Sequence, residues 1–433
     1  MMATALEHLI SEATLLISQR KYAEAAKQVH KSRDILMKNT NYLDTVLATL
    51  QPSQHTIAVA AVLRARLASA SHTDAAIDTL HATVAEFVAV CELNQLTHVQ
   101  HDMVEMLEEY CHLLVNGSCP MRGIEVVSSA VGKIQSCLTP HHMTGAHPLL
   151  LYLCLAAQCL KPAVRLLDKQ VTDVSRESDG FSIKHFLLYH YYGGMVYTAI
   201  KRYDRAYHFF KICISSPALA VSHIMMEAYK KYIIVSLLLG GKVSKLPKCA
   251  SMIVPRFIKP LCQVYCDLQQ CYQSGPDALS LYIQQHSVTF IRDGNYGLVK
   301  QLLVSQYKQS IQKLTRTFLT LSLSDVALRV KLQLPELAQQ YLLNMIEDGE
   351  IYASINQRDG MVVFKDNPEQ YNATDTLDLL HQRLLRVMEL EQRLEEMEES
   401  IQLNPTYIHK LAGSSEEDLP AQQMATTSTN LQP

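Results

Sequence analysis

The stretch that decides the fold is TLSLSDVALRVKLQLPELAQQYLLNMIEDGEIYASINQRDGMVVFK, residues 320 to 365. Its apolar periodicity predicts a helix that ends near Leu332, a tight turn, and a second helix over residues 336 to 348. Gly349 follows as a helix stop, and Asp359-Gly360 supplies the tight turn of a two-stranded hairpin. The order is therefore helix, turn, helix and hairpin.

That order is typical of a winged helix, whose second helix usually enters a DNA groove. Here the second helix contains Glu336, Glu347 and Asp348 but no Lys or Arg. Specific and non-specific DNA binding both depend on Lys and Arg side chains that neutralise phosphates. The sequence therefore predicts that this module binds protein, and nucleic acid is not expected as a partner.

Composition adds little about partners. The 433 residues are 48% apolar and 19% charged, and 39 basic against 42 acidic residues leave a net charge of -3. This composition is ordinary for a soluble protein, and the chain is long enough for two or three domains.

No stretch reaches the roughly 18 apolar residues of a membrane span, so no membrane association is expected. Eleven cysteines scattered singly predict reduced thiols, and hence a protein of the cytoplasm and nucleus.

The first 300 residues predict helices throughout, with one recurring pattern. A basic or Pro-containing turn precedes a small residue that opens a new apolar helix. Successive copies place Gly123, Ala163, Ala206 and, with Leu in place of the small residue, Leu246 at separations of 40, 43 and 40 positions. A two-helix unit repeated at that period predicts a helical solenoid.

The clearest unit resembles a tetratricopeptide repeat. Gly194, Tyr197, Ala206 and Phe210 fall at that repeat's small, aromatic, small and aromatic positions, and Pro217 is expected to end the second helix. Small residues let paired helices approach closely, while aromatic rings fill the groove between them. The neighbouring units match less well.

A long helix is predicted after the hairpin, over residues 377 to 411. Its apolar residues are spaced 4, 3, 3, 4, 3 and 4 positions apart, and the average of 3.5 favours packing in a helix bundle or coiled coil. They are Leu380, Leu384, Val387, Leu390, Leu394, Met397 and Ile401. Because a polar linker, residues 366 to 376, separates this helix from the closed module, its partner helices are expected in other chains.

The last residues, 412 to 433, are too polar to order themselves and predict a disordered tail. Ser414 and Ser415 each have an acidic residue three positions on, as acidophilic kinases prefer. They are candidate phosphorylation sites, where a phosphate would add negative charge.

Catalytic motifs are missing from the sequence. It has no HExxH, no phosphate-binding GxxxxGK[ST] and no GxSxG. His141, His142 and His147, near Cys137, form the densest group of metal-ligand types, but their spacing matches no tetrahedral site, and an exposed interhelical loop is the alternative interpretation. Cys262, Cys266 and Cys271 are interpreted as core thiols. The prediction is a non-enzyme without catalytic residues, metal or cofactor.

Helical repeats that run into a winged helix and then a lone bundle helix resemble the PCI family of scaffold subunits. The proteasome lid, a translation-initiation complex and the COP-9 signalosome share this family, and the chain is most similar to its signalosome members. The stretches that carry the resemblance are HFLLYHYYGGMVYTAIKRYDRAYHFF (185 to 210), AVSHIMMEAYKKYIIVSLLLGGKVSKLPK (220 to 248), TRTFLTLSLSDVALRV (315 to 330) and MIEDGEIYASINQRDGMVVFKDNPEQYN (345 to 372).

The resemblance implies a non-catalytic subunit of the complex that removes Nedd8 from cullins and so regulates cullin-RING ubiquitin ligases. The isopeptidase activity of that complex belongs to another subunit. Family analogy also implies two contacts with other signalosome subunits, one through the hairpin and one through the terminal helix. The expected hairpin residues are Ile351, Ala353, Ile355, Val362 and Phe364. Cullin-RING ligases would be reached through the complex.

The predicted fold is dominated by α-helices: a solenoid of helical repeats like the tetratricopeptide repeat, a winged-helix PCI module and a long C-terminal bundle helix. The predicted divisions are repeats over residues 1 to 195 and a PCI domain over 196 to 365, whose winged helix occupies about 315 to 365. Two alternatives stay open: a PCI subunit of the proteasome lid or an initiation complex, and a nucleic-acid-binding winged helix.

Overall fold

The computed structural model describes residues 2–70, 73–138, 141–169, 171, 173–175, 180–366 and 374–410. These residues divide into two compact units. The first holds the residues up to 317 together with 324–341, and the second holds 318–323 and the described residues from 342 on.

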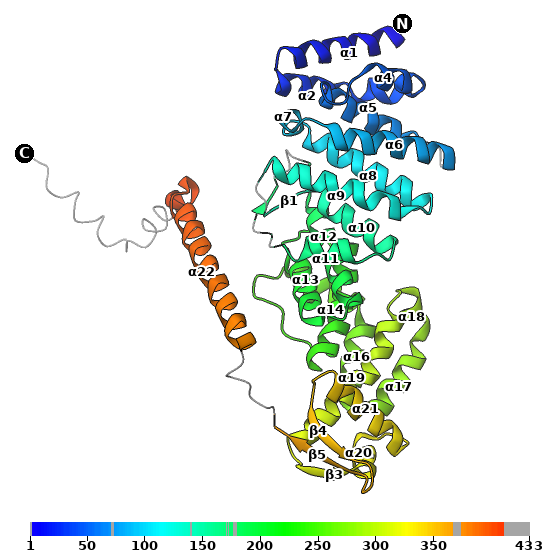
Figure 1. The fold of residues 1–433 in the computed structure, drawn as a ribbon, viewed down its shortest axis with the longest axis vertical. Helices are drawn as coiled ribbons and strands as arrows, with labels where there is room; N and C mark the ends of the chain where they lie inside the picture. The colour runs from blue at the N-terminus through cyan, green and yellow to red at the C-terminus, as the bar shows by residue number, and fades with distance from the viewer. Residues whose placement is uncertain are drawn as a thin grey trace, which may run out of the picture. The chain divides into compact units, whose positions relative to one another are not determined.

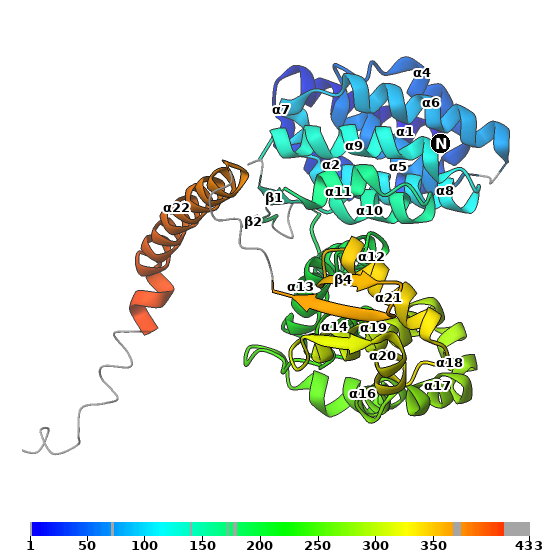
Figure 2. The ribbon, with the colours of Figure 1, turned by 60° about the horizontal axis from the view of Figure 1, so that its bottom comes forward.

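The first unit is a stack of helices that follow one another in chain order from α1 to α19 (Figure 1). Its first half contains α1 Met2–Ser18, α2 Tyr22–Lys31, α3 Arg33–Lys38, α4 Leu43–Thr49, α5 Thr56–Ala68, α6 Asp74–Val90, α7 Leu93–Leu96, α8 Gln100–Asn116, α9 Pro120–Ser136, α10 Ala146–Ala156 and α11 Lys161–Leu167. Its second half contains α12 Ile183–Ala199, α13 Tyr203–Ser215, α14 His223–Gly240, α15 Lys259–Leu261, α16 Gln263–Ser274, α17 Pro276–Gln285, α18 Ser287–Arg292 and α19 Tyr296–Thr315. A short parallel pair joins β1 His142–Met143 to β2 Asp173–Val174 (Figure 2).

The core of the first half forms around α5. Its sequence, TIAVAAVLRARLA, is apolar on nearly every face, and most of its side chains are buried. Helices α2, α4, α6 and α8 pack around it. A helix that is apolar all round has to be covered on all sides, which is what a stacked helical array provides.

The closest helix pairing lies between α12 and α13, where the sequence predicted the best repeat. An added Cβ atom on Gly193 would lie 2.6 Å from the Phe209 ring, and one on Gly194 would lie 2.6 Å from the Phe210 ring. Tyr197 and Phe210 are fully buried. The two glycines therefore let α12 approach the aromatic face of α13, as the repeat spacing predicted.

One predicted repeat is wrong. No helix begins at Leu246, and residues 241–252 form an irregular loop. Gly241 ends α14 in the left-handed conformation, with φ of 65°. Pro247 then disfavours helical backbone at Leu246, the residue before it. The chain becomes helical again only at a π-helical turn, Val254–Ile258.

The second unit contains the sheet and the terminal helix. Its strands are β3 Thr320–Ser322, β4 Tyr352–Asn356 and β5 Met361–Lys365, and α22 Thr374–Gln402 follows. Helices α20 Leu323–Val330 and α21 Pro335–Glu347 contribute residues to both units. The predicted fold class, a helical solenoid with a winged-helix module, is confirmed.

The predicted terminal helix is interrupted before its expected end at residue 411. Helix α22 ends at Gln402, and residues 405–410 form a separate helical turn. Pro405 explains the break, because proline cannot donate the hydrogen bond that would continue the helix. The tail with Ser414 and Ser415, and most of the predicted linker, lie outside the described residues. No described helix is both long enough and apolar enough to span a bilayer.

Two histidines are buried within the repeats. His147 in α10 is almost fully buried; its Nδ1 accepts the backbone N–H of Thr144 at 3.1 Å, and its Nε2 lies 3.0 Å from the side-chain amide of Gln135. Burial lowers the pKa of His147 to about 4, because the charged ring would lose its hydration. Burial lowers the pKa of His190 to about 4 for the same reason. Both rings are neutral in the folded chain at neutral pH.

These lowered pKa values predict acid-sensitive folding. Above pH 6.5 the rings are neutral in both states, and as the pH falls below 6.5 the unfolded chain takes up protons that the folded chain resists until about pH 4. Each buried histidine is expected to remove about 2 kcal/mol of stability between pH 7 and pH 5. Urea unfolding of His147→Asn at both pH values should show a loss smaller by that amount than in the unsubstituted chain.

The control for this experiment is His223→Asn, which changes an exposed histidine at the start of α14. We expect this variant to keep the full pH dependence. Equal pH dependence in His147→Asn and the unsubstituted chain would contradict the assignment of the effect to His147.

Candidate functional site: a sheet edge and a terminal helix

The sheet of the second unit has the strand order β3-β5-β4, and all pairs are antiparallel. Strand β5 is therefore central, with Val362 opposite Leu321 on one side and Ile355 on the other. No described strand pairs with the outer side of β4. The sequence predicted the hairpin but missed β3, because three residues ahead of a helix carry no alternation signal.

The topology places the five predicted hairpin residues at different depths in the module. Val362 and Phe364 lie on the central strand and are buried, as is Ile351 just before β4. Ala353 and Ile355 are half-buried. The side chains of the predicted hairpin residues therefore lie largely in the module's own core, because an amphipathic strand turns its apolar face inward, and their part in an interface stays a prediction. What β4 offers outward is its backbone and its exposed face.

The exposed face of β4 consists of Tyr352, Ser354 and Asn356. An unpaired strand edge presents backbone N–H and C=O groups that another strand can bind. The edge is five residues long, close to the usual length of a strand in a globular protein. It has the geometry for one additional strand.

Helix α21 stands where a DNA-binding winged helix would place its recognition helix. It carries no basic residue, and Leu337 and Leu343 are exposed on it. Exposed leucines cannot neutralise phosphates, whereas they can be buried against another protein. The observed helix agrees with the predicted preference for protein.

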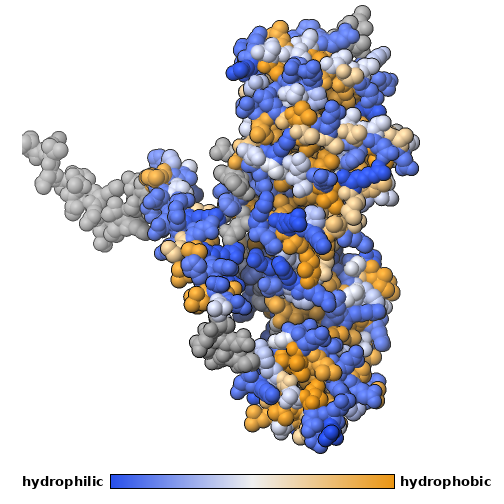
Figure 3. All heavy atoms as spheres, in the orientation of Figure 1, coloured by the Kyte–Doolittle hydropathy of each residue, from blue (hydrophilic) through white to orange (hydrophobic). Residues whose placement is uncertain are grey.

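Helix α22 is 29 residues long, and none of its side chains is buried. The seven predicted bundle residues, from Leu380 to Ile401, are each between 46 and 65% exposed. Figure 3 shows apolar residues beside polar ones on the visible face of α22. Exposed apolar side chains in such a run are costly in water, so the stripe is a surface suited to burial against other helices.

Two family matches cover most of the chain. Residues 19–254 match the family described as "COP9 signalosome complex subunit 3, N-terminal helical repeats", and residues 283–366 match the PCI domain. A protein of Drosophila melanogaster named COP9 signalosome complex subunit 3 is 40% identical over 99% of each chain. The chain belongs to the COP9 signalosome complex subunit 3 family. A relative of the same name from Dictyostelium discoideum is 32% identical over 93% of this chain and 95% of its own length.

Membership of the subunit 3 family agrees with the resemblance found in the sequence, and it favours a non-catalytic subunit. The PCI match ends at residue 366, one residue after β5, and therefore includes the hairpin and α21. The predicted interface residues and domain boundaries stay predictions, because the matches do not address them.

The histidines considered as metal ligands are not brought together as a site. His147 is buried in α10 with the partners described above, so the alternative of an exposed loop is wrong for this residue. His141 and His142 are half-buried at the start of the β1 segment. Across the described ranges no group of three His, Cys, Asp or Glu side chains is arranged to hold a metal.

The cysteines near residue 266 are packing residues in this structure. Cys262 is buried, and burial raises the pKa of its thiol to about 11. Burial also raises the pKa of Cys266 and of Cys271. Thiols with raised pKa values remain protonated at neutral pH and are poor nucleophiles and metal ligands.

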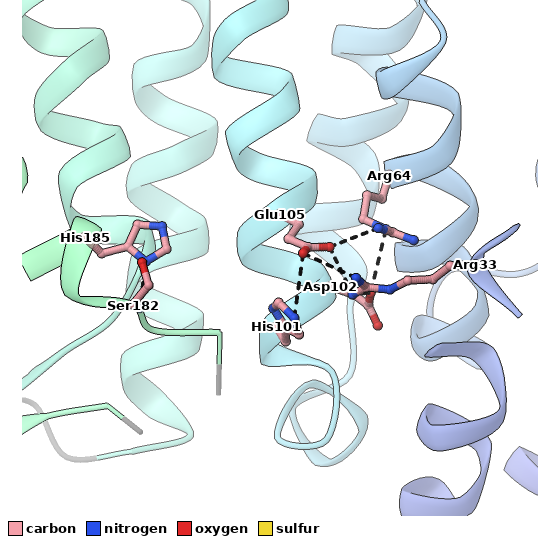
Figure 4. Close-up of polar contacts among 7 residues, drawn as sticks. All are labelled: Arg33, Arg64, His101, Asp102, Glu105, Ser182 and His185. Atoms are coloured by element: carbon pink, nitrogen blue, oxygen red, sulfur yellow. Dashed lines mark hydrogen bonds and ion pairs between the residues drawn. The ribbon is translucent and has the colours of Figure 1, made fainter. Parts of the chain in front are cut away.

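A charged cluster that the sequence did not reveal ties three helices of the first unit together (Figure 4). Arg33 of α3 lies 2.8 Å from Asp102 and 3.0 Å from Glu105, both on α8, and Arg64 of α5 lies 3.0 Å from Glu105. The two guanidinium groups balance the two carboxylates. Because the pairs are 41 to 72 positions apart in the chain, no local pattern predicts them. We assign the cluster a structural role in the repeats.

Proposed function

We propose that this chain is a non-catalytic scaffold subunit of the COP9 signalosome, the complex that removes Nedd8 from cullins. The observation that carries the proposal is α22, whose apolar stripe has no buried side chain. A helix of this kind is stabilised by packing in a bundle with helices of other chains. The free edge of β4 supplies the second contact, by pairing with a strand of a neighbouring subunit.

The remaining parts of the proposal follow from the same reasoning. The isopeptidase activity resides in another subunit, and the lack of a His-x-His zinc pattern in this sequence agrees with this. Cullin-RING ubiquitin ligases are reached through the assembled complex, which acts in the cytoplasm and the nucleus. Phosphorylation of Ser414 or Ser415 would add negative charge to the tail without changing these contacts.

Co-expression with the other signalosome subunits tests the proposal. At physiological salt we expect the full chain to elute with them as one complex, with one copy per complex by native mass spectrometry. Recovery of the chain as a free monomer would contradict the proposal. Retention on heparin or RNA that falls steeply with salt would favour the nucleic-acid alternative, and isopeptidase activity of the isolated chain would contradict a scaffold role.

Lysines on β4 test the proposed sheet edge separately. Tyr352→Lys, Ser354→Lys and Asn356→Lys together place three positive charges on the exposed face of the edge strand, and charged edges resist pairing with another strand. We expect at least tenfold weaker association with the neighbouring subunit, measured by competition with the unsubstituted chain during assembly. The triple variant should keep its far-UV circular dichroism, since all three side chains are exposed.

The matched control for the β4 lysines is on α17. Leu281→Lys, Gln284→Lys and Gln285→Lys would add the same charge to three exposed positions on a helix of the first unit. Equal assembly of the β4 variant and the unsubstituted chain would rule out this strand as a contact.

A further inference from the structure

The first unit contains an open cavity of about 670 Å³ that none of the assembly contacts uses. Its walls come from the start of α12, the second half of α13 and the irregular loop 241–252, and Figure 1 shows this loop beside α13. Phe181 and Phe186 line one side, and Pro247 and Cys249 of the loop line the other. One wall of the cavity is therefore the loop 241–252, in which the sequence had predicted the start of a repeat helix.

Several large apolar side chains of the lining are exposed. Val174, Ile183 and Ile212 all line the cavity and are 43, 60 and 44% exposed. Leu219, two residues after the lining residue Pro217, is fully exposed. Large apolar side chains gathered around one hollow mark a binding surface more often than they mark ordinary surface.

The segments that frame the cavity carry more basic than acidic residues. From Tyr203, where α13 begins, to Lys259 the chain has nine Lys and Arg residues and two acidic residues, Asp204 and Glu227. Glu227 is paired with Lys230 and does not line the cavity. Lys211 is in the lining, and Lys248 lies in the loop between the lining residues Pro247 and Cys249. Asp173, adjacent to Val174, is the nearest acidic residue in sequence to a described lining residue. A ligand for this site should carry negative charge.

A polar group inside the cavity also lacks a partner. The Oγ atom of Ser215 is shielded from solvent, and among the described residues it has no hydrogen-bond partner. Buried hydroxyl groups are normally hydrogen-bonded, so this one is an unsatisfied polar group in the wall of the cavity. It lies on α13 one turn after Lys211, which places a hydrogen-bonding group and a positive charge along one wall.

We propose that this cavity binds an acidic peptide segment of a partner protein, with a bulky apolar side chain in the hollow and its carboxylates against Lys211 and Lys248. A peptide fits better than a small amphiphile, because the exposed apolar residues extend beyond the hollow and the lysines are spread over α13 and the loop. The apolar anchor supplies affinity, and the carboxylates supply orientation and a faster encounter. The lining contains no residue of β4 or α22, so the proposed contact uses other residues than the assembly contacts.

Selection from a library of random dodecapeptides on the full chain tests the proposal. The enriched peptides should have net negative charge and at least one large apolar residue, and their affinity, measured by fluorescence anisotropy, should fall as salt rises. Ile212→Glu and Lys211→Glu should each weaken binding at least tenfold. Ile291→Glu changes an isoleucine of α18 that is 60% exposed and distant from the cavity lining, and it should leave binding unchanged.

Cys249 provides an independent readout that needs no substitution. It is exposed and lines the cavity, so a bound peptide should slow its alkylation by maleimide at least fivefold. Cys119, the residue before α9, is half-buried and lies outside the lining, and it should react at an unchanged rate, as followed by mass spectrometry of peptide fragments.

Three results would overturn the proposal. The first is enrichment of basic or uncharged peptides. The second is peptide binding that Ile212→Glu and Lys211→Glu leave intact and that does not protect Cys249. The third is that no peptide is enriched, whereas the fatty acid dodecanoate binds and protects Cys249. The last result would assign the cavity to a lipid carboxylate instead.

Discussion

Glutamate at Leu384, Leu394 and Met397 is expected to abolish stable incorporation of the chain into its complex. All three side chains lie on the apolar stripe of α22, and the structure leaves them about half exposed. Burying a leucine or methionine contributes roughly 1.5 to 3 kcal/mol, and a buried unpaired carboxylate costs more. Because about 1.4 kcal/mol changes affinity tenfold, the triple variant should bind its bundle at least a hundredfold more weakly. Size-exclusion chromatography of the co-expressed subunits measures this loss.

The same experiment needs a control of equal charge. Gln382→Glu and Gln392→Glu add glutamates to α22 on the face opposite the stripe, and Ser400→Glu adds a third beside it at a polar position. This control should assemble normally. The repeats of both variants should melt at the temperature of the unsubstituted chain, because no side chain of α22 is buried in this chain. Normal incorporation of the stripe variant would refute the bundle.

Valine at Gly194 is expected to destabilise the repeats more than any surface change. The Cβ atom alone would lie 2.6 Å from the Phe210 ring, a distance that requires α12 and α13 to separate or the ring to move. Phe210 is fully buried, so it has no open space to enter. Overpacking of this kind costs about 3 kcal/mol, and in a solenoid it also weakens the coupling between neighbouring repeats. Thermal unfolding followed by circular dichroism should shift down by about 5 °C or more.

Gly132→Val is the matched control for this prediction. Gly132 is also inside a helix, α9, but an added Cβ atom there would meet nothing within 4 Å. Valine is a slightly better helix former than glycine, so the stability should change by less than about 0.5 kcal/mol. Similar melting temperatures for the two variants would contradict the assignment of Gly194 to a close helix contact.

Much of the architecture could be predicted because its signals are local. The spacing of Gly194, Tyr197, Ala206 and Phe210 predicted a close pair of helices, and the structure places them in α12 and α13. The helix after Pro335 and the Asp359-Gly360 turn predicted the winged helix, and the structure has α21 and the β4–β5 hairpin there. These patterns are read within one or two turns of chain, where helix and turn preferences act.

Other features could not be predicted, because they depend on residues distant in sequence. Pairing of β3 with β5 makes Val362 and Phe364 part of a core instead of an edge. The burial of His147, the Arg33–Asp102 pair and the cavity around Ile212 all arise where separate helices meet. The prediction of a helix start at Leu246 was wrong for a local reason. Pro247 disfavours helical backbone at Leu246, but the prediction gave more weight to the spacing of the repeats.

The sequence by itself determined the type and order of the elements: helical repeats, a winged helix without positive charge on its second helix, and an amphipathic terminal helix. It also determined the family, since the stretches that carry the resemblance are continuous. Only the tertiary structure decided which strand edge is free, which apolar side chains are buried and where an open cavity remains. The physical reason is that periodicity specifies which face of an element is apolar, whereas contact with distant elements decides whether that face is covered.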